Sequence, residues 1–256
     1  MERGSYVAAS GGMLEMKRLE VVNNNLANID TPGFKRELIM GDEESFDQTL
    51  ASVTAKNDPF AKGDHDRSPG TVNVRSVTDF SPGPIEHTGN PFDLALRHPN
   101  DFFAINTANG GTQYTRAGNF TLNSNGELVT SDGQQVQGDG GAIQINDANV
   151  SIQPDGRVMA NGNQVALVQV VHIDDTSQLR RTGNSRFVLP PGSATPEAVE
   201  FPEMVPESLE KANVSAVNGI IDLILTQRGF EMYTQTAQQI DTMNQSAIAQ
   251  IGRKNS

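Results

Sequence analysis

The chain of 256 residues contains neither cysteine nor tryptophan, and aromatic residues make up only 5% of it. Without cysteine it has no disulfides, no thiolate metal site and no cysteine nucleophile, and its redox compartment stays open. Apolar residues make up only 36%, whereas 24 glycines and 13 prolines predict a turn-rich β body. The length is sufficient to bury a sizeable core without disulfides or metals.

Basic residues are also few, with 19 Lys and Arg against 31 Asp and Glu and a net charge of -12. Binding to nucleic acid requires clustered Lys and Arg that neutralise phosphates, and the basic residues of this chain are scattered. We therefore exclude nucleic acid as a partner. The negative charge by itself indicates no more than solubility.

Targeting signals are missing from the sequence. The first five residues lack the basic stretch and the following apolar stretch of a secretory signal peptide. No run approaches the roughly 18 apolar residues of a membrane span. We expect any export of the chain to use a route without a cleaved signal peptide.

Patterns that carry chemistry are missing as well. The four histidines stand far apart, and none belongs to a spaced ligand motif. His172 with Asp174 and Asp175 is the best metal candidate, but a solvated acidic turn is the commoner explanation. Residues 138–141 are glycine-rich without the Lys-Ser/Thr of a phosphate loop. We predict no enzyme, no metal site, no cofactor and no small-molecule substrate.

The two ends of the chain predict helices. Glycine and proline are absent from residues 13–29, and only two glycines interrupt residues 209–251. The first segment carries an apolar stripe at alternating spacings of three and four, which extends back through Glu15 to Gly12 and Ala8. Its members are Leu19, Val22, Leu26 and Ile29.

The last segment carries a stripe with a period of about 3.5 residues. Its members are Leu223, Thr226, Phe230, Tyr233, Ala237, Ile240, Asn244, Ala247 and Ile251. A helix over residues 216–251 would be roughly 54 Å long. So long a helix with so narrow a stripe needs a partner helix, and the N-terminal segment is the obvious one. The alternative is a pair of ordinary terminal helices packed on the β core.

The middle of the chain predicts short β hairpins. Strand-like runs cover residues 102–105, 119–122 and 165–171. Between such runs stand Asn-Gly and Asp-Gly pairs, which accept the positive φ angles of tight turns. These pairs begin at Asn125, Asp132, Asp155 and Asn161. Residues 57–70 have few apolar side chains and predict an exposed or disordered linker.

The predicted fold class is α+β, with long N- and C-terminal helices that pair as a coiled-coil-like layer and a central all-β domain of short hairpins. We expect residues 1–30 and 209–256 to form the terminal helical domain. Residues 31–85 are expected to form an extended linker region. Residues 86–208 are expected to form the β domain, with a proline-rich return linker at its end.

Three parts of the sequence carry a family resemblance. Residues 24–35 read Asn-Asn-Leu-Ala-Asn-Ile-Asp-Thr-Pro-Gly-Phe-Lys and resemble the signature shared by flagellar rod and hook proteins. Residues 213–217 and 227–231 resemble the C-terminal helix motif of the same family. Residues 88–96, 102–103, 114–120 and 125–130 resemble its β domain. The signature also makes local sense, because Pro-Gly at 32 and 33 suits a type II turn after a helix.

The resemblance implies a structural subunit of the bacterial flagellar basal-body rod that polymerises through its terminal helices and transmits torque from motor to hook. It implies partners among copies of the chain, other proximal and distal rod proteins and the neighbouring hook side. It also implies export through the flagellar type III apparatus to the outside of the cytoplasmic membrane, which is the periplasm in a two-membrane cell. The terminal helical domain would then be the assembly domain.

Several alternatives stay open. The length and residues 1–6 and 30–34 are most similar to proximal rod members of the family, with distal rod members as close relatives. A distal rod or hook-type subunit is one alternative. A surface β adhesin or carbohydrate-binding module is another, from a different class.

The stripes and the motifs together nominate partner-binding residues. These are Leu19, Val22, Asn24, Asn25, Leu26, Asn28, Ile29, Phe34, Asn213, Val214, Val217, Leu223, Gln227, Arg228, Phe230, Tyr233, Ile240 and Ile251.

Overall fold

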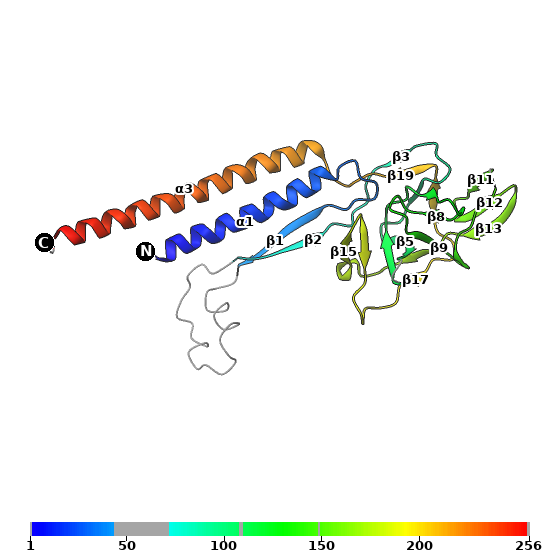
Figure 1. Ribbon diagram of the computed structural model, residues 1–256, viewed down its shortest axis with the longest axis horizontal. Helices are drawn as coiled ribbons and strands as arrows, with labels where there is room; N and C mark the ends of the chain where they lie inside the picture. Colours follow the sequence, from blue (N-terminus) through cyan, green and yellow to red (C-terminus); the bar gives the residue numbers. More distant parts are fainter. Residues whose placement is uncertain (1, 44–71, 108–109, 148, 255–256) are drawn as a thin grey trace. The chain divides into compact units, whose positions relative to one another are not determined.

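A computed structural model describes residues 2–43, 72–107, 110–147 and 149–254 of the chain (Figure 1). The chain divides into two compact units. Unit 1 comprises Met1–Leu26, Glu37–Val77 and Ala216–Ser256, and unit 2 comprises Ala27–Arg36 and Thr78–Ser215. The predicted α+β class is confirmed, with a helix toward each end and β structure in the middle. The linker predicted over residues 57–70 lies outside the described residues.

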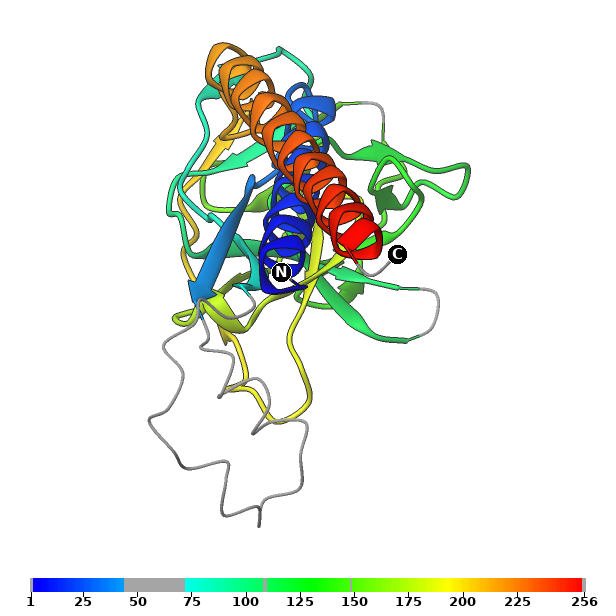
Figure 2. The same ribbon diagram turned by 90° about the vertical axis from the view of Figure 1, so that its left-hand side faces the viewer.

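Unit 1 contains two helices and a pair of strands. Helix α1 spans Glu2–Ala27 and helix α3 spans Ala216–Lys254, and the two lie side by side in both views (Figures 1 and 2). Strand β1 (Glu37–Glu43) pairs with β2 (Val72–Thr78). This pair falls within residues 31–85, where the sequence predicted an extended linker region.

Helix α1 ends at Ala27, two residues before the last member of its predicted stripe. Pro32 disfavours a helical conformation at the residue before it, so the helix must end before the signature does. The turn that follows contains Gly33 at a φ of 64°. Ile29 therefore lies beyond the helix, which corrects the prediction that it continues the stripe.

Unit 2 is built around a ten-stranded sheet in which every pairing of neighbouring strands is antiparallel. Its main order is β15-β16-β6-β5-β9-β8-β7, while β10 pairs with β9, β14 pairs with β5, and β17 pairs with β14. The strands are β5 (Asp101–Asn106), β6 (Thr112–Thr115), β7 (Thr121–Leu122), β8 (Leu128–Val129), β9 (Gln135–Gly138), β10 (Gly141–Ala142), β14 (Val170–His172), β15 (Arg180–Gly183), β16 (Arg186–Val188) and β17 (Glu197–Ala198).

Smaller sheets complete unit 2. A three-stranded sheet has the order β11-β12-β13, and two ribbons pair β18 with β4 and β19 with β3. The bounds are β11 (Val150–Ile152), β12 (Arg157–Ala160), β13 (Asn163–Leu167), β4 (Leu94–Leu96), β18 (Met204–Pro206), β3 (Ile85–His87), β19 (Ser208–Glu210) and the short 3-10 helix η2 (Thr176–Gln178). The predicted turn glycines Gly126, Gly133, Gly156 and Gly162 all have positive φ.

Residues 209–215 differ from the prediction that placed them with the terminal helix. Ser208 to Glu210 form β19, whose partner is β3, and the backbone N–H of Lys211 donates to the Pro84 carbonyl at 2.9 Å. These ladder bonds and the burial of Glu210, which is 1% exposed, keep this segment within the β unit. The helix itself begins at Ala216, as the sequence predicted.

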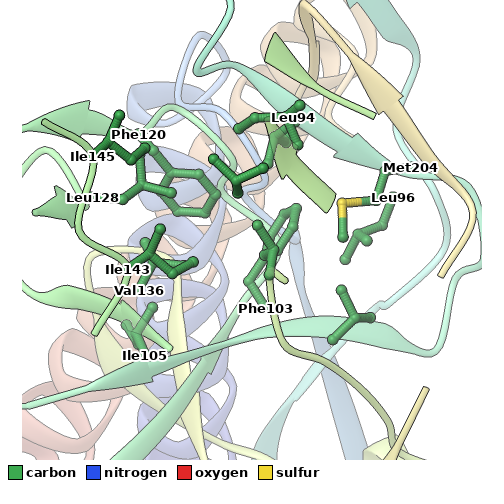
Figure 3. Close-up of a cluster of buried hydrophobic side chains, with 14 residues drawn as sticks. Leu94, Leu96, Phe103, Ile105, Phe120, Leu128, Val136, Ile143, Ile145 and Met204 are labelled. Atoms are coloured by element: carbon green, nitrogen blue, oxygen red, sulfur yellow. The ribbon is translucent and has the colours of Figure 1, made fainter. Parts of the chain in front are cut away.

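Strand β5 is buried on both faces and organises the core. Phe103 and Ile105 belong to the larger apolar cluster, part of which Figure 3 shows. Phe102 and Ala104 point to the opposite face and join a second cluster with Phe187. Because successive side chains of a strand point to opposite faces, β5 contributes side chains to both clusters. Unit 2 is therefore held together by two apolar clusters that share β5.

Candidate functional site

Helices α1 and α3 contact each other in an antiparallel arrangement. A Cβ atom placed on Gly11 would lie 2.3 Å from Cε1 of Tyr233, and one on Gly229 would lie 3.2 Å from Cδ of Glu15. A Cβ atom placed on Gly219 would lie 3.6 Å from Cδ1 of Leu26. In these three contacts the residue numbers rise along α1 and fall along α3, so the two helices are antiparallel. The glycines allow the close approach of the two helices, because a side chain there would meet the partner helix.

The predicted stripe of α3 faces α1. Thr226 is buried, at 8% exposure, although the sequence identified it as a polar interruption. Phe230 and Tyr233 are each 36% exposed, and the remaining described stripe residues of α3 are half-buried. These are Leu223, Ala237, Ile240 and Asn244. On α1, Leu19, Val22 and Leu26 are half-buried.

Some predicted residues of α3 lie off this stripe. Val217 is 67% exposed, and Gln227 and Arg228 are exposed. Asn24 of α1 is exposed as well. Ile251 lies in α3, but its side chain is outside the described residues. The stripe therefore gathers Leu223, Phe230, Tyr233 and Ile240 of the predicted set and leaves Val217, Gln227 and Arg228 outside it.

A shallow apolar hollow of about 240 Å³ lies between the two helices. We call it the helix groove. It is lined by Ala8, Ala9, Gly12, Met13 and Met16 of α1 and by Phe230, Tyr233, Thr234 and Ala237 of α3. None of these side chains is charged.

Asn25 fastens the last turn of α1 to the start of β1. Its side-chain Nδ2 donates to the backbone carbonyl of Glu37, and its Oδ1 accepts from the backbone N–H of Glu37, both at 2.8 Å. Asn28 has a similar local role, because its Oδ1 accepts a hydrogen bond from the Thr31 hydroxyl at 3.2 Å. The asparagines of the signature thus hold the chain's own turns.

Asn213 joins three segments of unit 2. Its Oδ1 accepts from the backbone N–H of Arg36 at 2.7 Å, and its Nδ2 donates to the carbonyls of Asp79 at 2.8 Å and Ser81 at 3.1 Å. Each bond satisfies a backbone group of a residue that lies outside the strands. The neighbouring Val214 is half-buried.

Gly33 and Phe34 are enclosed by the β unit. Phe34 is 3% exposed, and the Arg181 guanidinium lies 4.6 Å from the centre of its ring. Arg181 also donates from Nη2 to the carbonyl of Lys35. A Cβ atom on Gly33 would lie 2.3 Å from the backbone N of Ala117, so glycine is required there for space and for φ.

Lys35, Arg116 and Glu210 form what we call the buried ion network. Lys35 Nζ lies 2.6 Å from Glu210 Oε1, and Arg116 Nη2 lies 2.7 Å from Glu210 Oε2. All three side chains are at most 1% exposed. Arg116 also donates to the carbonyls of Asp101 and Leu96. Burial lowers the pKa of the Lys35 amine, and the Glu210 carboxylate partly opposes that shift.

Sequence reasoning missed this network. Lys35 is the last residue of the signature, but nothing in the sequence links it to a carboxylate 175 positions later. The one available signal was Glu210, one of two glutamates in the short segment between Pro206 and the helix. From the sequence alone, a charged residue in such a segment is expected to be exposed, and only the strand pairing of β19 shows that it is buried.

The metal candidate of the sequence forms a small polar cluster. His172 Nδ1 lies 2.7 Å from Asp101 Oδ1, and His172 Nε2 lies 3.4 Å from Asp174 Oδ1. The hydrogen bond to Asp101 is the main cause that raises the pKa of His172. In the part of the chain that the structure describes, no group of three or more His, Asp or Glu residues could hold a metal ion.

Helices α1 and α3 are long, but neither is apolar enough to cross a membrane. Within residues 2–43, 72–107, 110–147 and 149–254, no helix combines the length and the apolar character needed to cross a bilayer.

Models of three protein families match the chain. Residues 6–35 match the family described as flagella basal body rod protein. Residues 99–160 match the flagellar hook protein FlgE/F/G D1 domain, and residues 205–251 match the flagellar basal body rod FlgEFG protein C-terminal family. The matches fall on the same three parts of the chain that carried the resemblance.

Individual proteins are similar to the chain over nearly its whole length. The flagellar basal-body rod protein FlgF of Caulobacter vibrioides is 31% identical over 258 residues, which cover 100% of both chains. FlgF of Rhizobium meliloti is 32% identical, with 98% of this chain and 99% of the relative covered. The flagellar basal-body rod protein FlgG of Caulobacter vibrioides is 30% identical, with 93% of this chain and 95% of the relative covered.

Proposed function

Because the chain belongs to the flagellar basal-body rod protein family and is FlgF-like, we propose that it is a structural subunit of the proximal rod. In this role it polymerises through its terminal helices and transmits torque from the motor to the hook. The helical parts of residues 1–30 and 209–256 form the assembly domain. We propose no catalytic role, cofactor or small-molecule substrate.

The observation that supports this function best is that α3 faces α1 on one side and exposes large apolar side chains on the other. One stripe of this 39-residue helix faces α1 across the glycine contacts, as a coiled-coil-like layer requires. Its outer face nevertheless exposes large apolar side chains, among them Val217, Ile221 and Leu225 at 67%, 49% and 60% exposure. Contiguous apolar surface of this kind marks an interaction site. Neighbouring subunits would cover it in the rod.

Export and assembly are coupled in this proposal. The subunit leaves through the flagellar type III apparatus without a cleaved signal peptide and assembles outside the cytoplasmic membrane, in the periplasm of a two-membrane cell. Helices without a complete core of their own are marginal in isolation and become ordered when a partner covers their stripes. The partners are copies of the chain, other proximal and distal rod proteins and the neighbouring hook side.

Replacing Leu26 or Ile240 by glutamate tests the function. Both side chains are half-buried on the predicted stripes. A buried, unpaired carboxylate is strongly unfavourable, so we expect either variant to be excluded from basal bodies and to leave the cells non-motile. Unit 2 should stay folded, as measured by hydrogen exchange of β5 in the purified chain.

A matched control is Gln239→Glu, which adds the same charge beside Ile240 at an exposed position of α3. Cells with this variant should swim. Motile cells that carry Leu26→Glu or Ile240→Glu, with the variant chain present in their basal bodies, would contradict the proposed role of the stripes.

A distal rod subunit is the second candidate. The observation that favours it is the FlgG relative, whose identity of 30% is close to the 31% of the FlgF relative from the same organism. Labelling the chain in purified basal bodies and measuring its height along the rod decides between the two. A label at the motor-side end supports the proximal assignment, and a label at the hook-side end supports the distal one.

A further inference from the structure

Unit 1 presents a second apolar surface besides the helix groove. It lies on the first turns of α3 and consists of Val217, Ile220, Ile221, Ile224 and Leu225, which are 46% to 67% exposed. We call it the α3 ridge. Like the helix groove, it contains no charged side chain.

The α3 ridge points away from α1. A helix turns by about 100° per residue, so Ile224 lies roughly 160° around the helix from Thr226. Thr226 is buried on the face toward α1. Helix α1 of the same chain therefore cannot cover the ridge.

We propose that the α3 ridge of one copy seats in the helix groove of the next copy. This inference rests on the proposed function and names the contact by which the helices polymerise. Branched side chains of the ridge act as knobs, and Ala8, Ala9 and Gly12 leave the hole that receives them. The side chains that make up the groove and the ridge are uncharged, while the exposed Arg228, one turn beyond Ile224, flanks the ridge and can keep its guanidinium in water.

The two surfaces share no residue, so one copy can use both at once. A contact between two different surfaces is heterologous, and it propagates as an open filament unless its rotation closes a ring. A self-complementary contact would stop at a dimer. The separation of groove and ridge on one chain therefore suits a polymer.

The size of the ridge also favours a polymer over a stable dimer. Its five side chains offer roughly 450 Å² of exposed apolar area, whereas a stable interface buries about 800 Å² on each partner. A single contact is thus too small to hold two free subunits together. A subunit inside a filament makes the contact twice, once through each surface, and gains enough area to stay.

Cysteine trapping tests this contact, and the chain has no cysteine of its own to interfere. One full-length variant carries Met13→Cys in the groove, and a second carries Ile221→Cys in the ridge. Both side chains are exposed, at 61% and 49%, so neither change threatens the fold. The variants are mixed in equal amounts under mild oxidation and run on a non-reducing gel.

We expect the mixture to give a disulfide-linked heterodimer about tenfold above the yield of a mixture in which Gln239→Cys replaces the ridge variant, a ratio that corresponds to about 1.4 kcal/mol. A single chain carrying both Met13→Cys and Ile221→Cys should give a ladder of oligomers. Ile221→Cys alone forming homodimers at the higher yield, or a heterodimer yield equal to the control, overturns the proposed contact.

The outcome is separable from the proposed function. If the ridge pairs with itself, the groove contact is wrong, while the stripe variants Leu26→Glu and Ile240→Glu still decide whether the helices carry assembly. If those stripe variants assemble normally, the proposed function fails whatever the cross-linking shows.

Discussion

Replacing Glu210 by glutamine removes one negative charge from the buried ion network without changing the shape of the side chain. The carboxylate accepts hydrogen bonds on both oxygens, from Lys35 and the backbone N–H of Gly83 on Oε1 and from Arg116 on Oε2. Glutamine offers a single acceptor oxygen, so its amide N–H must face one of the two cations. The substitution thus removes a charge, and it also places an N–H donor of the glutamine against an N–H donor of Lys35 or Arg116.

The expected loss of stability follows from the burial of the ion network. Lys35 and Arg116 are both 0% exposed, so water cannot take over the role of the carboxylate. Breaking a buried ion pair from one side costs about 3–5 kcal/mol because it leaves a charge without a partner. A typical domain has a free energy of unfolding of about 5–15 kcal/mol, so unit 2 should lose a large part of its stability.

The assay is a urea titration of the full chain, read by hydrogen exchange of peptides from β5. That strand reports on unit 2 because Phe102, Phe103 and Ile105 are 0% exposed. The matched control is Glu207→Gln, three positions earlier. Its carboxylate is 53% exposed and 3.9 Å from His87, and the substitution should change the free energy by less than about 0.5 kcal/mol.

Lys35→Met completes the test. It removes one cation but leaves Arg116 paired with Glu210 at 2.7 Å, so it should destabilise unit 2 less than Glu210→Gln does. Burial lowers the pKa of Lys35 below 10.5, so the parent chain should gain stability as the pH rises through that lowered pKa, and the Met variant should not. A loss below about 1 kcal/mol for Glu210→Gln, or a larger loss for Lys35→Met, refutes the reasoning.

Two further predictions concern unit 2. Gly33→Ala should lower its free energy of unfolding by about 2–4 kcal/mol, because the new Cβ meets the backbone of Ala117. The control is Gly89→Ala, since Gly89 also has a positive φ but has open space around it. In the same urea titration this control should cost only about 1–2 kcal/mol. His172→Gln should remove a pH dependence. The raised pKa of His172 contributes stability that is fully present below pH 6.5 and is lost as the pH rises through the folded-state pKa. The free energy of unfolding of the parent chain, measured by urea titration, should therefore fall over that pH range, and that of the His172→Gln variant should not.

The parts of the fold that the sequence predicted are those encoded locally. The period of the α3 stripe is visible within a few turns, and the helix begins at Ala216, as the sequence predicted. Gly126 and Gly162 follow asparagine, a pair that favours tight turns, and both have positive φ. Nothing beyond neighbouring residues is needed for either inference.

The parts that the sequence did not predict depend on distant partners. Strand β19 exists because β3, more than a hundred residues earlier, supplies its ladder. The same is true of Glu210, whose burial is possible only where Lys35 and Arg116 meet it. A short polar segment gives no local sign of such partners, so its assignment to the helix was the natural error.

The predicted partner-binding residues fall into two groups, according to whether their side chains already make contacts within the subunit. Asn25, Phe34 and Asn213 make contacts within their own unit, through paired hydrogen bonds or near-complete burial. A side chain whose bonding groups are occupied in the free subunit has little left to offer a neighbour. Val217 and Arg228, in contrast, are exposed on α3. We infer that substitutions of the first kind weaken the subunit before it assembles, whereas substitutions of the second kind leave its stability intact and act on assembly alone.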